Sequence, residues 1–152
     1  MTLPAAGTAA PDFTLPSTAG STVTLSALRG KKVLLAFFPA AFTSVCSEEL
    51  CALSEDYDAF RQSDTVVLPI SVDQTPSLKA FRAQEGLQVD LLSDTRRDVC
   101  RAYGVLNPDR FNAERAYVLI DRDGIVRWSF REEHPGFRRQ NADLLVQLDR
   151  VP

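Results

Sequence analysis

Apolar residues follow two alternating patterns along the chain. Residues 33–38 and 66–72 are almost continuously apolar and rich in β-branched or aromatic side chains, which is typical of strands covered on both faces. Between them, large apolar side chains recur at spacings of three and four, which predicts an amphipathic helix over residues 43–60. Strand, helix and strand in this order predict a crossover unit with two parallel strands and with helices on both faces of the sheet.

The rest of the chain continues this alternation. Helices are predicted over residues 76–84, 96–103 and 137–151, and a short strand over residues 90–92. Residues 116–121 and 125–130 predict a β-hairpin, and two short strands are expected near Phe13 and Val23. This order predicts a thioredoxin-like α/β fold, with a central mixed β-sheet flanked by helices, in which residues 1–152 form a single domain.

The composition excludes several classes of protein. The net charge is −3 and the basic residues are scattered, so neither nucleic acid nor a membrane surface is an expected partner. The pairs Arg96-Arg97 and Arg138-Arg139 are expected on solvated helix faces. The N-terminus lacks the basic and apolar regions of a signal peptide, and no apolar run is long enough to span a bilayer. A cytoplasmic protein is therefore expected.

The cysteines point to packing or redox chemistry. Cys46, Cys51 and Cys100 are an odd number in a chain without a secretion signal, which argues against a structural disulfide framework. A closed zinc site needs four cysteine or histidine ligands, often in C-x-x-C pairs, and the chain has no such pair and one histidine, His134. We therefore expect no metal, and we interpret His134 as a loop residue.

Cys46 is expected at the start of a helix. Thr43 is a good N-cap, which places Cys46 in the first helical turn. Backbone N–H groups in that turn lack intrahelical partners, and the positive end of the helix dipole favours an anion, so a thiolate is stabilised there. From periodicity alone, a cysteine that only packs under the sheet is an equally good interpretation.

The segment PAAFTSVC, residues 39–46, resembles the P-x-x-x-T-x-x-C active-site loop of the peroxiredoxins. The resemblance extends to APDFTL at residues 10–15, LSD at 92–94, AYGV at 102–105 and VLIDRDGIVR at 118–127. The stretch FFPAAFT is most similar to the AhpE-type subgroup, whereas a cysteine five residues after Cys46 is similar to the bacterioferritin-comigratory (PrxQ) subgroup. The resemblance implies N-terminal strand additions of the peroxiredoxin type to the thioredoxin-like fold. We expect no organic cofactor, because none is required to regenerate a reactive cysteine with a thiol reductant.

The resemblance also implies a function and a set of site residues. The protein would reduce hydrogen peroxide and organic hydroperoxides, with Cys46 as the nucleophile that becomes a sulfenic acid. Thr43 and the first-turn N–H groups would stabilise the departing oxygen, and Pro39 would shield the loop. Arg115 matches the arginine that the family places against the thiolate. Glu49, three residues after Cys46, is predicted to pair with Arg115 and orient it.

Cys51 is the predicted resolving cysteine. Residues five apart on a helix have Cα atoms roughly 8 to 9 Å apart, and a disulfide needs less than about 7 Å, so the Cys46–Cys51 bond requires the first turns to unwind. Alternatively, Cys51 is a small packed residue. Cys100 is interpreted as a packing residue and as the reserve resolving cysteine.

The expected physiological reductant depends on whether an intramolecular disulfide forms. An intramolecular disulfide would be reduced by a thioredoxin-like protein, and without one a low-molecular-weight thiol or a glutaredoxin-like partner would take over. We expect a monomer or homodimer. Two other classes remain as alternatives: a thiol-disulfide oxidoreductase, which normally needs the C-x-x-C spacing that this chain lacks, and a peroxide-sensing thiol relay without fast turnover.

Overall fold

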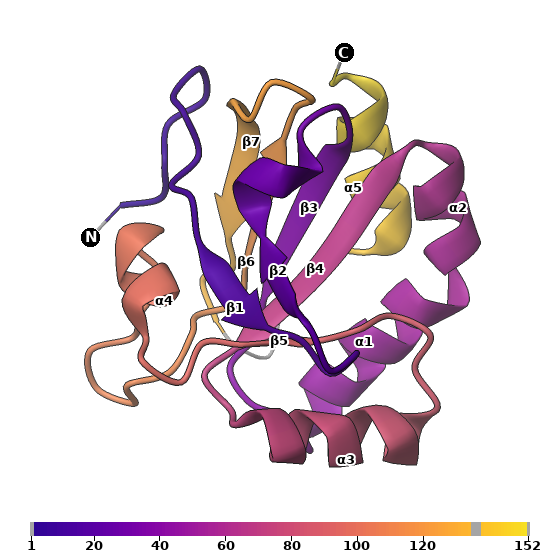
Figure 1. Ribbon diagram of the computed structural model, residues 1–152, viewed down its shortest axis with the longest axis vertical. Helices are drawn as coiled ribbons and strands as arrows, with labels where there is room; N and C mark the ends of the chain where they lie inside the picture. The colour runs from indigo at the N-terminus through magenta and orange to yellow at the C-terminus, as the bar shows by residue number, and fades with distance from the viewer. Residues whose placement is uncertain (1, 135–137, 152) are drawn as a thin grey trace.

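A five-stranded mixed sheet forms the centre of the computed structural model, which describes residues 2–134 and 138–151 (Figure 1). The strand order is β5-β4-β3-β6-β7. Strands β3, β4 and β5 are parallel, whereas β6 runs antiparallel to β3 and β7 antiparallel to β6. The strands are β3 (Lys32–Phe37), β4 (Thr65–Ser71), β5 (Leu92–Ser93), β6 (Ala116–Ile120) and β7 (Val126–Arg131). This arrangement confirms the predicted thioredoxin-like α/β class.

Each face of the sheet buries its own apolar cluster because side chains alternate along the strands. Leu34 and Ala36 of β3 belong to one cluster, and Val33, Leu35 and Phe37 belong to the other. The first cluster is completed by helices α1 (Ser44–Glu55), α2 (Tyr57–Gln62), α3 (Thr75–Glu85) and α5 (Asn141–Asp149).

The opposite face is covered by short helices and by two strands. An antiparallel pair of strands, β1 (Thr14–Pro16) and β2 (Thr22–Thr24), crosses it together with the short helices η1 (Leu25–Leu28) and α4 (Asp98–Ala102) (Figure 1). Helices therefore cover both faces of the sheet, as predicted, and on this face they share the cover with the two N-terminal strands. In the described part of the chain, no helix is long and apolar enough to cross a membrane.

The helix predicted over residues 43–60 is two helices, which meet at Asp56. The backbone of Asp56 leaves the helical region, with φ −96° and ψ 16°, and α2 begins at the next residue. A contact from α5 accompanies the break: Asn141 donates from its side-chain amide to the Ala52 carbonyl at 2.7 Å and to the Asp56 carboxylate at 2.9 Å. An amide donor from another element cannot be predicted from local periodicity.

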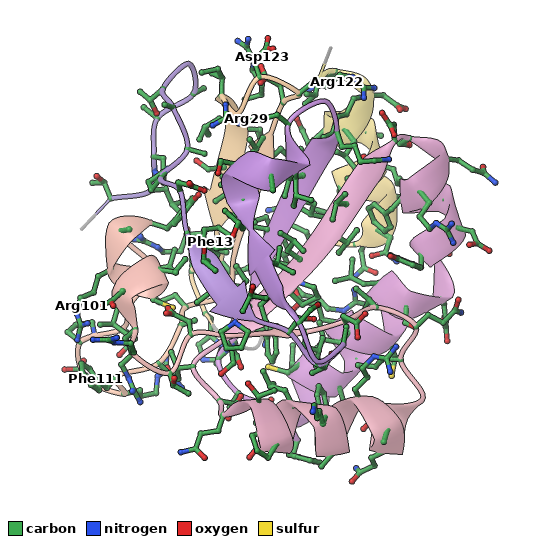
Figure 2. All side chains as sticks on the ribbon, viewed as in Figure 1. Phe13, Arg29, Arg101, Phe111, Arg122 and Asp123 are labelled. Carbon is green, nitrogen blue, oxygen red and sulfur yellow. The ribbon has the colours of Figure 1, made fainter. Side chains whose placement is uncertain are left out.

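The two arginine pairs do not lie on helix faces as predicted. Arg97 precedes α4 and has a left-handed backbone, with φ 66°. Its guanidinium donates to the Phe111 carbonyl at 2.8 Å and lies over the Phe111 ring, and Figure 2 shows Arg101 near the same ring. Arg138 and Arg139 precede α5, which begins at Asn141. The predicted start of that helix, residue 137, lies outside the described residues.

Candidate active site

The loop between β3 and α1, residues 38–43, has its shape fixed by contacts to the loop after β4 and to α3. The backbone N–H of Ala41 donates to the Asp73 carboxylate at 2.9 Å. Phe42 has a left-handed backbone with φ 64°, which is strained for a residue with a bulky side chain, and its ring packs edge-on against Phe81 with centroids 5.2 Å apart. These contacts set where the chain enters α1, immediately after Thr43.

Cys46 lies in the first turn of α1, as predicted, and is almost completely buried. The first intrahelical bond runs from the Ser47 N–H to the Thr43 carbonyl at 2.8 Å. The N–H groups of Ser44, Val45 and Cys46 therefore precede the helical ladder and face the N-terminal end of the helix. An anion at this end is stabilised by those groups and by the helix dipole.

Thr43 is the N-cap residue by backbone conformation, but its side chain does not cap the helix. The hydroxyl donates to the Ala40 carbonyl at 3.0 Å, and it forms no cap hydrogen bond with α1. The expected side-chain cap was therefore wrong in its partner, because a carbonyl three residues earlier in the same loop competes for the hydroxyl. Because the hydroxyl proton of Thr43 is donated to the Ala40 carbonyl, the hydroxyl oxygen can still accept a hydrogen bond at the site.

Arg115 joins the Cys46 sulfur to the Glu49 carboxylate. One terminal nitrogen of its guanidinium, Nη2, lies 3.0 Å from Cys46 Sγ, and the other, Nη1, lies 2.8 Å from Glu49 Oε1. Arg115 is 2% exposed and immediately precedes β6. Burial acts against the charged form, yet Glu49 and Cys46 raise the pKa of Arg115, so this residue is a fixed cation beside the sulfur.

Glu49 is held from a second side by Tyr117 of β6. The Tyr117 hydroxyl donates to Glu49 Oε2 at 2.7 Å, and it accepts the backbone N–H of Arg139 at 2.9 Å. Burial raises the pKa of the Glu49 carboxyl, and the charge of Arg115 and the hydrogen bond from Tyr117 oppose that rise. Sequence reasoning missed Tyr117, although its position two residues after Arg115 places it on the same side of an extended strand.

A pocket of about 320 Å³ gives access to this cluster. Its lining combines the loop, the start of α1 and the segment before β6: Pro39, Ala40, Thr43, Ser44, Val45, Cys46, Arg110, Asn112 and Arg115. The predicted residues Pro39, Thr43, Cys46 and Arg115 thus share one pocket, and Glu49 lies behind Arg115. A larger cavity of about 490 Å³ between β1 and α4 has no cysteine in its lining and lies away from this chemistry.

The other two cysteines have different surroundings. Cys51 is half-buried in the same helix as Cys46, and its sulfur lies 3.6 Å from a carboxylate oxygen of Glu85. Burial, and after it Glu85, raise the pKa of the Cys51 thiol. Cys100 is fully buried in the cluster on the opposite face of the sheet, and burial and Asp94 raise its pKa strongly. All three cysteines are free thiols.

A cysteine at a helix N-terminus, held by a buried arginine on a thioredoxin-like sheet, defines a class of thiol-dependent redox proteins. The sequence matches the AhpC/TSA family over residues 6–129, and the chain belongs to this family. It is a peroxiredoxin, an oxidoreductase.

Similar proteins agree with this assignment. The chain is 42% identical to "Alkyl hydroperoxide reductase E" of Mycobacterium tuberculosis over 147 residues, which cover 93% of this chain and 96% of that protein. It is 35% identical to "Peroxiredoxin Bcp" of Escherichia coli, with 82% and 84% of the two chains covered. Among solved structures, the reduced 2-Cys peroxiredoxin of Plasmodium vivax superposes with a TM-score of 0.87 at 32% identity, covering 95% and 80% of the chains. Both subgroups expected from the sequence, the AhpE type and the bacterioferritin-comigratory type, occur among these relatives.

Proposed function

We propose that this protein is a thiol-dependent peroxidase that reduces hydrogen peroxide and organic hydroperoxides at Cys46. The observation that carries the proposal is the 3.0 Å contact between Cys46 Sγ and Arg115, at the N-terminal end of α1 and in a pocket. The name of the mycobacterial relative, an alkyl hydroperoxide reductase, supports the same substrate class.

The reaction begins with attack of the Cys46 thiolate on one oxygen of the hydroperoxide. The S–O bond forms as the O–O bond breaks, which oxidises the sulfur to a sulfenic acid and releases an alkoxide or hydroxide that takes up a proton. The negative charge moves from sulfur to the departing oxygen during this step. Arg115 and the N–H groups of the first turn are donors that can hydrogen-bond first to the thiolate and then to the departing oxygen. Such preorganised donors stabilise the transition state.

Thr43 and Pro39 complete the substrate site in this proposal. The Thr43 hydroxyl donates to the Ala40 carbonyl, so its oxygen is free to accept the O–H of the incoming hydroperoxide. This role orients the peroxide, because the acceptor fixes the protonated oxygen and leaves the other oxygen to the sulfur. Pro39 lines the same pocket and removes one backbone donor that would hold water there.

Cys51 is the proposed resolving cysteine. Its thiol would attack the sulfenic acid of Cys46, form the disulfide and release water, and a thioredoxin-like protein would then reduce the disulfide. The two residues lie in one continuous helix, so the step requires the first turns of α1 to unwind. Cys100 is a poor alternative, because it is fully buried on the opposite face of the sheet from Cys46.

A one-cysteine cycle is the second candidate, and one observation favours it. The thiol of Cys51 is hydrogen-bonded to Glu85 and its pKa is raised, so in the folded helix Cys51 is a weak nucleophile. In that cycle a low-molecular-weight thiol would resolve Cys46. The cytoplasmic location, the single domain and the monomeric or homodimeric state remain predictions.

Intact mass with peptide mapping distinguishes these cycles. The fully reduced protein is treated with one equivalent of hydrogen peroxide, with Cys46→Ser as the negative control and Cys100→Ser as the matched cysteine control. Loss of two hydrogens with a Cys46–Cys51 crosslink supports the two-cysteine cycle. A stable gain of oxygen on Cys46 supports the one-cysteine cycle, and peroxide consumption by Cys46→Ser at the normal rate overturns the proposed function.

A further inference from the structure

Both carboxylate oxygens of Glu49 are occupied, each by a different partner. Oε1 accepts from Arg115 at 2.8 Å and Oε2 accepts from Tyr117 at 2.7 Å. Glu49 is 2% exposed, so these protein donors replace the water that an exposed carboxylate would have. The charge of Glu49 thus depends on Tyr117 as well as on Arg115.

The direction of the Tyr117 hydrogen bond is fixed by its neighbour on the other side. The backbone N–H of Arg139 can only donate, and it lies 2.9 Å from the Tyr117 oxygen. The hydroxyl must therefore accept from Arg139 and point its own proton at Glu49. A hydroxyl whose rotation is fixed from outside is a preorganised donor, and it favours the ionised form of Glu49.

The planar guanidinium of Arg115 transmits this constraint to the sulfur. Its two terminal nitrogens are fixed relative to each other, so the position of Nη1 on Glu49 also sets the position of Nη2 on Cys46. We propose that Tyr117 is a positioning residue of the peroxidase site, which acts on Cys46 through Glu49 and Arg115. This inference rests on the proposed function and extends the site beyond the residues that line the pocket.

The outer end of the chain of contacts is the segment just before α5. Arg139, whose N–H fixes Tyr117, also contacts Glu132 through its side chain at 3.3 Å and lies 3.9 Å above the Phe130 ring. Arg139 thus supports the site from behind, through Tyr117. The groups that face Glu49 are Arg115, Tyr117 and Arg138, with Cys46 one turn before it on the same helix.

The test compares Tyr117→Phe with Tyr103→Phe. Tyr103 is an equally buried tyrosine whose hydroxyl donates to the Pro11 carbonyl at 2.6 Å in the other apolar cluster, so it controls for the loss of a buried hydroxyl. The measured quantity is the rate of Cys46 oxidation by peroxide as a function of pH, and folding is checked by thermal unfolding. Without its Tyr117 donor, Glu49 protonates at a higher pH and releases Arg115.

We expect the acid limb of the Tyr117→Phe rate profile to move to higher pH, with a rate about tenfold lower at neutral pH, the loss that one hydrogen bond to a charged group can cause. Tyr103→Phe should keep the normal profile. In a Glu49→Gln background, Tyr117→Phe should produce no further shift, because the group through which it acts no longer titrates. An unchanged profile in folded Tyr117→Phe, or equal slowing in both tyrosine variants without a shift, overturns the inference.

Two further measurements keep the test decisive. If Tyr117→Phe does not fold, a fluorinated tyrosine at position 117 keeps the shape and donates more strongly, so the acid limb should move to lower pH; no movement overturns the inference. If the normal protein does not react with peroxide, the proposed function fails separately. The pH profile of Cys46 alkylation by iodoacetamide then replaces the peroxide rate. An acid limb that moves to higher pH in Tyr117→Phe, but not in the Glu49→Gln background, supports the role of Tyr117, and an unchanged profile overturns it.

Discussion

The thiol of Cys51 in α1 donates a hydrogen bond to the carboxylate of Glu85, the last residue of α3, over 3.6 Å. Burial raises the pKa of Cys51, and Glu85 and then Glu55 raise it further. The folded helix therefore keeps Cys51 as a neutral thiol at neutral pH. In the proposed two-cysteine cycle, unwinding of α1 would separate Cys51 from Glu85 and make the thiol more acidic when it attacks the sulfenic acid.

Glu85→Gln should speed the resolution step severalfold, because a neutral amide of similar shape holds the Cys51 thiol less strongly in folded α1 than the Glu85 carboxylate does. The rate of disulfide formation after rapid oxidation is measured by quenching with acid and mass analysis. Glu55→Gln is the matched control, since Glu55 acts on Cys51 only by its charge and should have a smaller effect. Equal rates of disulfide formation in the normal and Glu85→Gln proteins would show that the contact with Glu85 does not limit the release of Cys51.

Arg115→Lys should slow the oxidation of Cys46 by about a hundredfold, the loss seen when one preorganised donor is removed from a site of this kind. Lysine keeps the charge, but its single ammonium cannot bridge Cys46 and Glu49 as the guanidinium does. Arg115→Ala is a poorer test, because it leaves a buried carboxylate unpaired and should cost about 3–5 kcal/mol of stability. Stopped-flow oxidation and urea unfolding, measured together, separate the two effects; a normal oxidation rate in Arg115→Lys contradicts the assigned role.

Thr43→Val should impair the rate much more than the stability. The hydroxyl forms no cap hydrogen bond and the residue is exposed, so the free energy of unfolding should change by less than about 0.5 kcal/mol. The oxidation rate should fall about tenfold if the hydroxyl accepts the peroxide O–H. Thr43→Ser keeps the hydroxyl and should retain most of the rate. The reverse order, with a large loss of stability and a normal rate, would make Thr43 a structural residue.

The free energy of unfolding should fall as pH rises above about 8.5, the ordinary pKa of a cysteine. Burial raises the pKa of Cys100 in the folded protein, so the folded state keeps a proton that the unfolded state loses, and alkaline pH favours unfolding. One such group contributes a slope of up to about 1.4 kcal/mol per pH unit. Urea unfolding of the normal protein and Cys100→Ala, in reductant between pH 7.5 and 9.5, should show a smaller slope in the variant. Equal slopes would contradict this account.

Local signals predicted the strands and the start of the active-site helix. The apolar runs that became β3 and β4 were displaced by only one residue, because a continuous apolar run of that length has few alternatives in a globular chain. Cys46 was correctly expected in the first helical turn, because Thr43 is a residue type that favours the N-cap position and so marks where the helix begins. The Arg115–Glu49 contact was expected from charge and helix spacing together with the family resemblance, and it is present.

The features that the sequence did not reveal depend on residues far away along the chain. The break at Asp56 coincides with hydrogen bonds from Asn141, 85 residues later, and helix periodicity carries no trace of that partner. Tyr117 is oriented by a backbone N–H at Arg139, which no side-chain pattern encodes. The hydroxyl of Thr43 was misassigned for the opposite reason, since two partners compete within one short loop and only geometry decides between them.

The contact between Asn141 and the end of α1 has a consequence for how far the helix can open. The Ala52 carbonyl and the Asp56 carboxylate are both clamped by the Asn141 side chain, so the far end of α1 is anchored just beyond Cys51. Unwinding from Thr43 would then stop near that clamp and leave Cys46 on a short tether to Cys51. A short tether keeps two sulfurs at high effective concentration, because closing a small loop costs little entropy. In the proposed two-cysteine cycle, Asn141 would thereby favour formation of the Cys46–Cys51 disulfide from a position remote from the peroxide.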